Sequence, residues 1–257
     1  MSVEARDATA AIFARVRSTR PLVHCITNGV TVGRVADALA AVGALPVMAS
    51  AAEEADEIDA AADALLLNCG TPSAARWEAM QAAARTASAN GVRVVLDPVG
   101  VAASRWRRDH ARGLVGVARP VVRGNALEVA SLAGVAARGM ARGVSALDVD
   151  PDAIESLAVE AARALGTTVL VSGPVDAVAD ATHARSARNE GDAPSVVGLG
   201  DVLGALVAAA CPFEPDALEA AWAARILLTD AVAAARAAAT GPGSFWPALI
   251  DALGATR

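Results

Sequence analysis

Short apolar runs rich in Val, Leu and Ile alternate along this chain with alanine-rich stretches of helical length. Strands that are buried on both faces read as continuous apolar runs, and the helices between them connect parallel strands. The alternation therefore predicts an α/β fold built around a parallel sheet. Strands are expected at residues 21–26, 45–48, 64–68, 92–96, 120–122, 168–171 and 175–179. Long helices are expected at residues 73–89, 151–165, 201–211 and 215–239, and the polar residues 182–194 are expected to form a surface loop or flap.

The length and hydropathy of the chain predict one compact domain over residues 1–257. A chain of 257 residues that is 54% hydrophobic can bury a sizeable core, and no repeat or linker divides it. The longest apolar runs, near residues 202–211 and 231–239, reach about ten residues, whereas a membrane span needs roughly 20. The first twenty residues mix acids with arginines, unlike a secretory signal. We therefore expect a cytoplasmic protein with no membrane contact.

Charge and missing residue types exclude several classes of function. The net charge of −6 argues against nucleic acid as a partner, because phosphate backbones are bound by clustered positive charge. The chain contains no lysine, which excludes a Walker A loop, a protein kinase and a pyridoxal phosphate enzyme. Cys25, Cys69 and Cys211 are too scattered for a disulfide framework or a zinc motif, so we expect reduced, mostly buried thiols.

Polar residues or glycines follow most of the predicted strands. The carboxyl ends of parallel strands lie along one edge of the sheet, where open α/β folds bind ligands. Taken singly, Asn28, Asn68 and Asn125 are more often turn formers or helix caps than ligand-binding residues. Taken together, the strand-ending residues predict a polar cleft: Thr27, Asn28, Asn68, Gly70, Thr71, Asp97, Arg123, Asn125, Ser172 and Gly173.

Two carboxylates in this set are candidates for a metal site. Asp97 follows a predicted strand in LDPVG, and Glu128 lies five positions after Arg123, in the first turn of the next predicted helix. Helix capping is the alternative role for Asp97. Two carboxylates without a neighbouring His or Cys suit a hard cation that binds oxygen, and Mg²⁺ typically shares its ligands with a nucleotide. The pair therefore predicts Mg²⁺ bound together with a nucleotide.

The segment GLGDVLGALVAAA combines two glycines with the start of a helix predicted at Asp201. Gly198 and Gly200 free the backbone there, and the unpaired N–H groups and the dipole of a helix N-terminus form an anion hole. Asp201 could be a plain N-cap. The functional alternative has Asp201 accept the proton of a substrate hydroxyl as that oxygen attacks a γ-phosphoryl group, with Mg²⁺, Arg123 and the anion hole stabilising the charge.

Seven blocks of the sequence carry a resemblance to a known family. They are HCITNGVT, LPVMASAAEEADEI, LDPVGV, VVRGNALEVASLAG, VLVSGPVDAVAD, GLGDVLGALVAA and GPGSFWPALIDAL. In this order they resemble the hydroxyethylthiazole kinase family of the ribokinase-like superfamily, over about residues 21–253. The resemblance implies a central, mostly parallel sheet flanked by helices. It also implies that ATP phosphorylates the hydroxyl of 4-methyl-5-(2-hydroxyethyl)thiazole with Mg²⁺, in thiamine salvage, and that the active sites lie at the subunit interfaces of a homotrimer.

The resemblance also implies roles for individual residues. It places Met48 and Gly198 at the thiazole, Arg123, Ser172 and Asn28 at ATP, and Asp97 and Glu128 at Mg²⁺.

Three departures from the family pattern concern the site. Many members carry Cys where this chain has Asp201, and an aspartate is the better proton acceptor at neutral pH because a free thiol has a pKa near about 8.5. Leu199 replaces a small hydroxyl residue and so removes a hydrogen bond to phosphate. Gly33 and Asp37 stand where asparagines are common near the substrate, which bears on substrate identity.

Two other functions fit parts of the sequence. A hydroxymethylpyrimidine kinase or an ADP-dependent NAD(P)H-hydrate dehydratase shares the GxGD pattern, a glycine turn followed by an aspartate. The HCITN and VMASA blocks favour the thiazole kinase. A thiazole- or nucleotide-binding regulator without turnover would have no need of Asp97, Arg123, Glu128 and Asp201 together.

Overall fold

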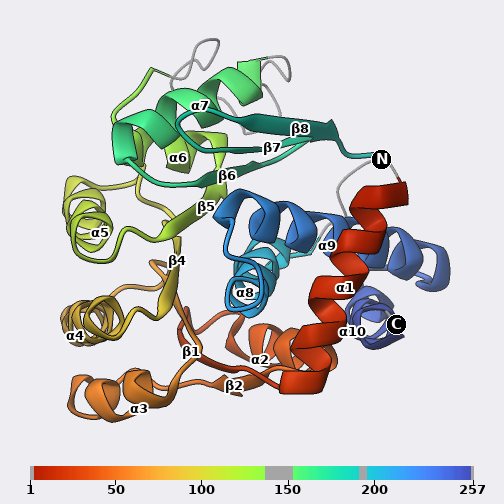
Figure 1. Cartoon of the computed structure of the whole chain (residues 1–257), viewed down its shortest axis with the longest axis horizontal. Helices are drawn as coiled ribbons and strands as arrows, with labels where there is room; N and C mark the ends of the chain where they lie inside the picture. The colour runs from red at the N-terminus through yellow and green to blue at the C-terminus, as the bar shows by residue number, and fades with distance from the viewer. Residues whose placement is uncertain (1–2, 137–152, 191–195, 256–257) are drawn as a thin grey trace.

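An eight-stranded sheet forms the middle layer of the molecule (Figure 1). The structure is a computed structural model and describes residues 3–136, 153–190 and 196–255. In spatial order the strands are β2 (Leu45–Val47), β1 (Leu22–Ile26), β3 (Ala64–Asn68), β4 (Arg93–Asp97), β5 (Val121–Asn125), β6 (Val169–Ser172), β7 (Val175–Ala179) and β8 (Ala184–Arg188). The strands from β2 to β6 are parallel, whereas β7 is antiparallel to both β6 and β8. The predicted α/β fold with a mostly parallel sheet is confirmed.

Helices cover both faces of the sheet (Figure 1). One layer consists of α1 (Val3–Thr19), α2 (Val32–Ala41), α8 (Leu199–Ala210), α9 (Ala217–Ala238) and α10 (Pro242–Ala255). The other consists of α3 (Ala55–Ala61), preceded by the short helix η1 (Ala52–Glu54), α4 (Ala74–Asn90), α5 (Arg105–Ala118), α6 (Ala126–Ala133) and α7 (Ile154–Leu165). An apolar core lies on each face. None of the described helices is long and apolar enough to cross a membrane.

The most deeply buried helix is α8, which packs on β3 and β4. Every residue from Val202 to Ala210 is buried, which explains the long apolar run in the sequence. A helix packed on all sides is held rigidly, because protein interiors are close-packed. Residues 198–200 at its N-terminus, which we call the glycine turn, are therefore fixed against the carboxyl edge of the sheet.

The strand predictions agree with the structure to within a few residues, but the loop or flap predicted at residues 182–194 is wrong for residues 184–188. Residues 184–188 of that predicted flap form β8, which pairs with β7, and residues 191–194 lie outside the described part of the chain. The strand was missed because its sequence, ARSAR, has no apolar run; as an edge strand it exposes Arg185 and Arg188. Of the helix predicted at residues 151–165, residues 151–152 lie outside the described part of the chain, and α7 begins at Ile154.

A buried polar cluster joins the β6–β7 turn to α9. Arg225 and Asp176 are 3% and 5% exposed, and Arg225 Nε lies 3.0 Å from Asp176 Oδ2. Arg225 Nη2 also donates to Asn189 Oδ1 at 2.8 Å, while Asp176 Oδ1 accepts the backbone N–H of Gly173 at 3.0 Å. The cluster thus fixes the turn that follows Ser172.

We expect Arg225→Ala to destabilise the protein strongly, because it leaves the Asp176 carboxylate buried without its cation. The free energy of unfolding should fall by about 3–5 kcal/mol. Arg6→Ala is the control, since Arg6 pairs with Asp230 at the surface at 3.0 Å, where loss of a pair costs under about 1 kcal/mol. Urea denaturation of both variants tests this, and equal effects would contradict it.

Candidate active site

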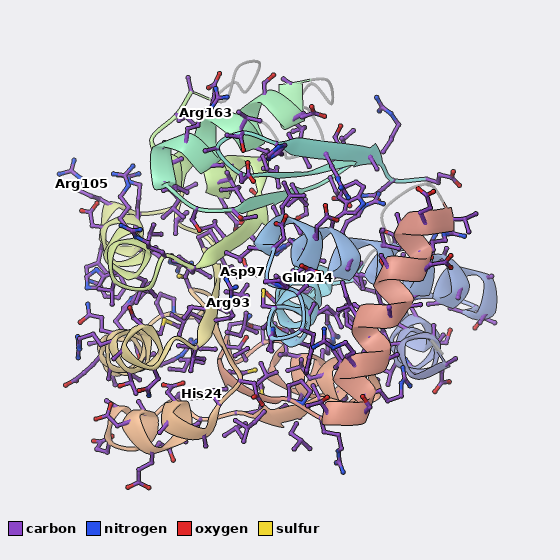
Figure 2. The ribbon with its side chains drawn as sticks, viewed as in Figure 1. His24, Arg93, Asp97, Arg105, Arg163 and Glu214 are labelled. Atoms are coloured by element: carbon purple, nitrogen blue, oxygen red, sulfur yellow. The ribbon has the colours of Figure 1, made fainter. Side chains whose placement is uncertain are left out.

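The carboxyl ends of five parallel strands meet the N-terminus of α8. Asp97, the last residue of β4, lies between that strand and α8 at the centre of the molecule (Figure 2). Asp97 accepts hydrogen bonds from Asn68 and Arg123 at the neighbouring strand ends. Asn68 in turn donates to Asp201 of α8. We call this set the strand-end network: Asn28, Thr31, Asn68, Asp97, Arg123, Ser172 and Asp201.

Asp201 does not cap its helix. The N-cap of α8 is Gly198, and the Asp201 carboxylate turns toward the strand ends instead. Its Oδ1 accepts a hydrogen bond from Asn68 Nδ2 at 2.8 Å and its Oδ2 accepts one from Thr31 Oγ1 at 2.5 Å. The N-cap alternative is therefore wrong, because the positive φ of Gly198, 109°, lets the helix begin before Asp201.

Asp97 is fully buried beside Arg123. Its Oδ2 accepts hydrogen bonds from Arg123 Nη1 at 3.1 Å and from Asn68 Nδ2 at 3.4 Å, whereas its Oδ1 has no partner among the described residues. Burial raises the pKa of Asp97 to about 7; Arg123 opposes this rise, while the negative charges of Glu128 and Asp201 add to it. A buried carboxylate oxygen without a donor is suited to a cation.

Glu128 has a structural role at the start of α6. Asn125 and Glu128 form a capping box, in which Glu128 Oε2 accepts the Asn125 N–H at 3.1 Å. Its Oε1 accepts the N–H of Gly100 at 2.8 Å, which ties the turn after β4 to the helix. Carboxylate oxygens keep further lone pairs, so Glu128 can still face a cation. Within the described residues, no three or more His, Cys, Asp or Glu side chains are grouped to hold a metal.

The glycine turn packs directly against two residues of the network. A Cβ at Gly198 would lie 2.7 Å from Thr31 Cγ2, and a Cβ at Gly200 would lie 2.3 Å from Arg123 Nη1. Arg123 Nη2 donates to Ser172 Oγ at 2.5 Å. The guanidinium is thus held at the N-terminus of α8, where both the positive charge and the helix dipole favour an anion.

Asn28 forms the turn after β1, which is the structural role expected from the sequence as the alternative to ligand binding. Its Oδ1 accepts the backbone N–H groups of Val30 at 3.0 Å and Thr31 at 3.1 Å, and its Nδ2 donates to Asn68 Oδ1 at 3.2 Å. It therefore shapes the turn after β1 and is joined to Asp201 through Asn68.

Met48, Gly33 and Asp37, which the family resemblance relates to the substrate, lie near β2 and α2. Met48 follows β2, is half-buried and packs against the core on the α8 side. Gly33 and Asp37 are exposed on α2; a Cβ at Gly33 would meet nothing within 4 Å, and Asp37 lines a groove between α2 and α10. Their bearing on substrate identity stays a prediction.

The predicted thiols are confirmed as buried and free. Burial raises the pKa of both Cys25 and Cys211 to about 12, and it also raises that of Cys69. The buried thiols are therefore protonated at neutral pH and are not nucleophiles.

Thr31 and Arg76 were missed as site residues. Arg76 donates to the carbonyls of Thr27 at 2.6 Å and Gly70 at 2.7 Å, so one guanidinium joins the turns that follow β1 and β3. In the sequence it is one of two arginines on an alanine-rich helix, and no local signal distinguishes it. Thr31 lies within the HCITNGVT block, which was the one available clue.

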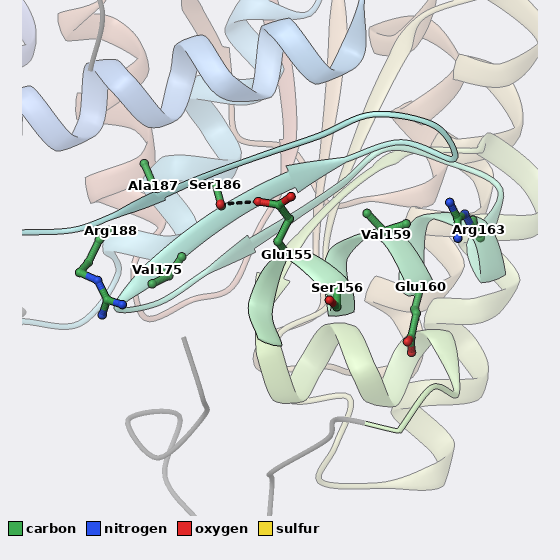
Figure 3. A pocket seen from close by; sticks show the side chains of 9 residues that line it. All are labelled: Glu155, Ser156, Val159, Glu160, Arg163, Val175, Ser186, Ala187 and Arg188. Atoms are coloured by element: carbon green, nitrogen blue, oxygen red, sulfur yellow. Dashed lines mark hydrogen bonds between the residues drawn. The ribbon is translucent and has the colours of Figure 1, made fainter. Parts of the chain in front are cut away.

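A separate groove lies between α7 and the β7–β8 hairpin (Figure 3). Its volume is about 690 Å³, and its lining includes Glu155, Arg163 and Arg188, with a hydrogen bond from Ser186 to Glu155. None of the predicted site residues lines it, so it is distinct from the strand-end network.

We expect the stability of the metal-free protein to report the raised pKa of Asp97. Between the usual pKa of 3.8 and about 7 the folded protein binds this proton more tightly than the unfolded chain, so the contribution of Asp97 to stability is lost as pH rises. Relative to Asp97→Asn, the free energy of unfolding of the wild type should fall by up to about 1.4 kcal/mol per pH unit across this window. Denaturation with EDTA at a series of pH values measures it; a constant difference would contradict the assignment.

A family model, curated relatives and a solved structure all match this chain to hydroxyethylthiazole kinases. The Hydroxyethylthiazole kinase family matches residues 13–256. The chain is 41% identical to the hydroxyethylthiazole kinase of Pectobacterium atrosepticum, over 98% of this chain and 97% of that one. The structure of a hydroxyethylthiazole kinase protein from Pyrococcus horikoshii superposes with a TM-score of 0.85 at 32% identity, covering 96% and 93% of the two chains. A ribokinase-like superfamily protein of Enterococcus faecalis shares the fold, with a TM-score of 0.60 at 14% identity over 94% and 89% of the chains.

Proposed function

The chain belongs to the hydroxyethylthiazole kinase family, and from that premise we propose that it transfers the γ-phosphoryl group of ATP to the hydroxyl of 4-methyl-5-(2-hydroxyethyl)thiazole. The reaction forms a phosphate ester and ADP and belongs to thiamine salvage. The observation that carries the proposal is the Asp201 carboxylate, which is held against Asn68 and Thr31 beside the glycine turn instead of capping α8. We retain the predicted cytoplasmic location as part of this proposal.

Asp201 is the proposed general base. It accepts the proton of the substrate hydroxyl while that oxygen forms a bond to the γ-phosphorus and the bond to the bridging oxygen of ADP breaks. Two hydrogen bonds, at 2.8 and 2.5 Å, fix the carboxylate before substrate arrives. An oriented base removes part of the entropic cost of reaching the transition state.

The ATP phosphates are assigned to Arg123, Ser172 and the glycine turn. Arg123 lies against Gly200 and binds Ser172 Oγ, so its charge lies at the N-terminus of α8. Backbone N–H groups at Gly198 and Gly200 would bind the transferring phosphoryl group. Asn28, at the turn after β1, completes the proposed set.

Asp97, together with Glu128, would hold the Mg²⁺ ion that neutralises phosphate charge during transfer. Support comes from Asp97 Oδ1, which is buried and has no hydrogen-bond partner among the described residues. Asn68 and Arg123 orient the same carboxylate through its other oxygen.

The thiazole is assigned to the side of the network near Met48 and Gly198, and a homotrimer is part of the proposal. Val30 and Val197 are each 65% exposed and flank the contact between Thr31 and Gly198. Exposed apolar side chains at the mouth of a site favour cover by another chain. A second copy beside these residues would place the substrate at a subunit interface.

We expect Asp201→Asn to lower kcat by roughly 10²–10⁴-fold, the range for loss of a general base, and to leave ATP affinity nearly unchanged. Asp109→Asn removes the same charge from an exposed position on α5 and should behave as wild type. Steady-state kinetics and nucleotide titration measure both effects. Wild-type turnover by Asp201→Asn would show that another group takes the proton.

A panel of acceptors tests the function itself. Purified protein is incubated with ATP, Mg²⁺ and either the hydroxyethylthiazole alcohol, hydroxymethylpyrimidine or no acceptor, and ADP is measured. Selective turnover of the thiazole is expected. Activity on the pyrimidine alone would overturn the substrate and implicate Gly33 and Asp37, and silence on every acceptor would favour a regulator that binds without turnover.

A further inference from the structure

Thr31 occupies a capping position but does not cap its helix. It is the N-cap residue of α2, where a threonine hydroxyl normally accepts a backbone N–H of the first turn. No such hydrogen bond is formed here, and the residue is 1% exposed. The hydroxyl instead donates to Asp201 Oδ2 at 2.5 Å, across 170 positions of sequence. A buried donor has thus been turned from its local partner toward a distant carboxylate.

The hydroxyl proton is directed to Asp201 and not to its other neighbour. Thr31 Oγ1 also lies 3.2 Å from Asn28 Oδ1, but a hydroxyl has a single proton. The contact to Asp201 is shorter, and a carboxylate is a stronger acceptor than an amide carbonyl. Because Asn68 donates to the opposite oxygen, at 2.8 Å, the two donors hold the carboxylate from both sides.

The first turn of α2 also holds the glycine turn that carries Asp201. The Thr31 methyl group occupies the space where a Cβ of Gly198 would lie, 2.7 Å from Cγ2. One helical turn further, Arg34 donates to the carbonyl of Val197 and stacks over the ring of Trp246, 4.4 Å from its centroid. Methyl group and guanidinium thus contact the backbone just before Asp201, while the hydroxyl contacts its side chain.

We propose that Thr31 is a positioning residue for Asp201: its hydroxyl fixes the orientation of the carboxylate that accepts the proton of the substrate hydroxyl. The inference rests on the proposed function, because it assigns Thr31 a part in that reaction. Loss of the hydroxyl leaves the carboxylate free to rotate, and misplacement of a reacting group lowers the rate of the chemical step more than it weakens binding. The effect therefore belongs to kcat and not to KM.

Two substitutions separate the hydroxyl from the methyl group. Thr31→Val keeps the branched shape and removes the donor, whereas Thr31→Ser keeps the donor and removes the methyl group. We expect Thr31→Val to lower kcat by roughly 10–10²-fold, with KM for ATP and for the thiazole alcohol changed by less than about threefold. Thr31→Ser should stay within about threefold of wild type. Thr9→Val is the matched control, because Thr9 is buried in α1 and donates to the carbonyl of Ala5.

A double variant tests whether Thr31 acts through Asp201. In the Asp201→Asn background, Thr31→Val should lower kcat little further, because the group it positions is absent. A second loss of the same size would overturn the proposal, as would equal losses in Thr31→Val and Thr31→Ser, or a wild-type kcat in Thr31→Val. Thr31→Cys, with a weaker donor of similar size, is expected to fall between the two single variants and decides the question if Thr31→Val folds poorly.

The wild-type assay distinguishes failure of the proposed function from failure of the positioning role alone. An inactive wild type on the acceptor panel overturns the proposed function and the positioning role together. An active wild type whose kcat survives Thr31→Val overturns the positioning role alone.

Discussion

The Asn68 amide lies between two carboxylates, and the arrangement of the site depends on it. Asn68 Nδ2 donates to Asp201 Oδ1 at 2.8 Å and lies 3.4 Å from Asp97 Oδ2. Like charges this close repel each other, which is one cause of the raised pKa of Asp97. The amide is held by its own acceptor contacts to Asn28 and the N–H of Gly70. A neutral donor at the end of β3 thus lies between Asp97, the proposed metal ligand, and Asp201, the proposed base.

The apolar body of the fold is what keeps these polar groups in place. Burial of α8 from Val202 to Ala210 fixes its N-terminus, and the absence of side chains at Gly198 and Gly200 admits Thr31 and Arg123. Buried charges are costly unless they are paired, and Arg123 supplies one pairing through Asp97. Asp97 Oδ1, which has no hydrogen-bond partner among the described residues, is the oxygen assigned to the proposed cation.

The sequence predicted the sheet well because apolar runs and strand burial have the same physical cause. Residues 64–68 and 175–179 match β3 and β7, whereas β8 was missed because an edge strand needs no apolar run. The expectation that the carboxyl ends of parallel strands meet at one edge of the sheet correctly grouped four residues: Asn68, Asp97, Arg123 and Ser172. It did not identify Thr31 or Arg76, because their hydrogen bonds join different elements and leave no local pattern. The glycine segment left a cap role open for Asp201, since the position of the helix start depends on the conformation of Gly198.

The aspartate in the glycine turn is linked to its surroundings. A carboxylate in a partly buried turn needs donors that a thiol, with its weak hydrogen bonding, does not need. Thr31 and Asn68 provide one donor to each oxygen of Asp201, which meets this need. Leu199 packs against the core, so in the proposed mechanism the anion is bound by the backbone and by Arg123. In this chain the proposed base is oriented from α2 by Thr31, while residues 198–200 of the glycine turn carry no hydroxyl.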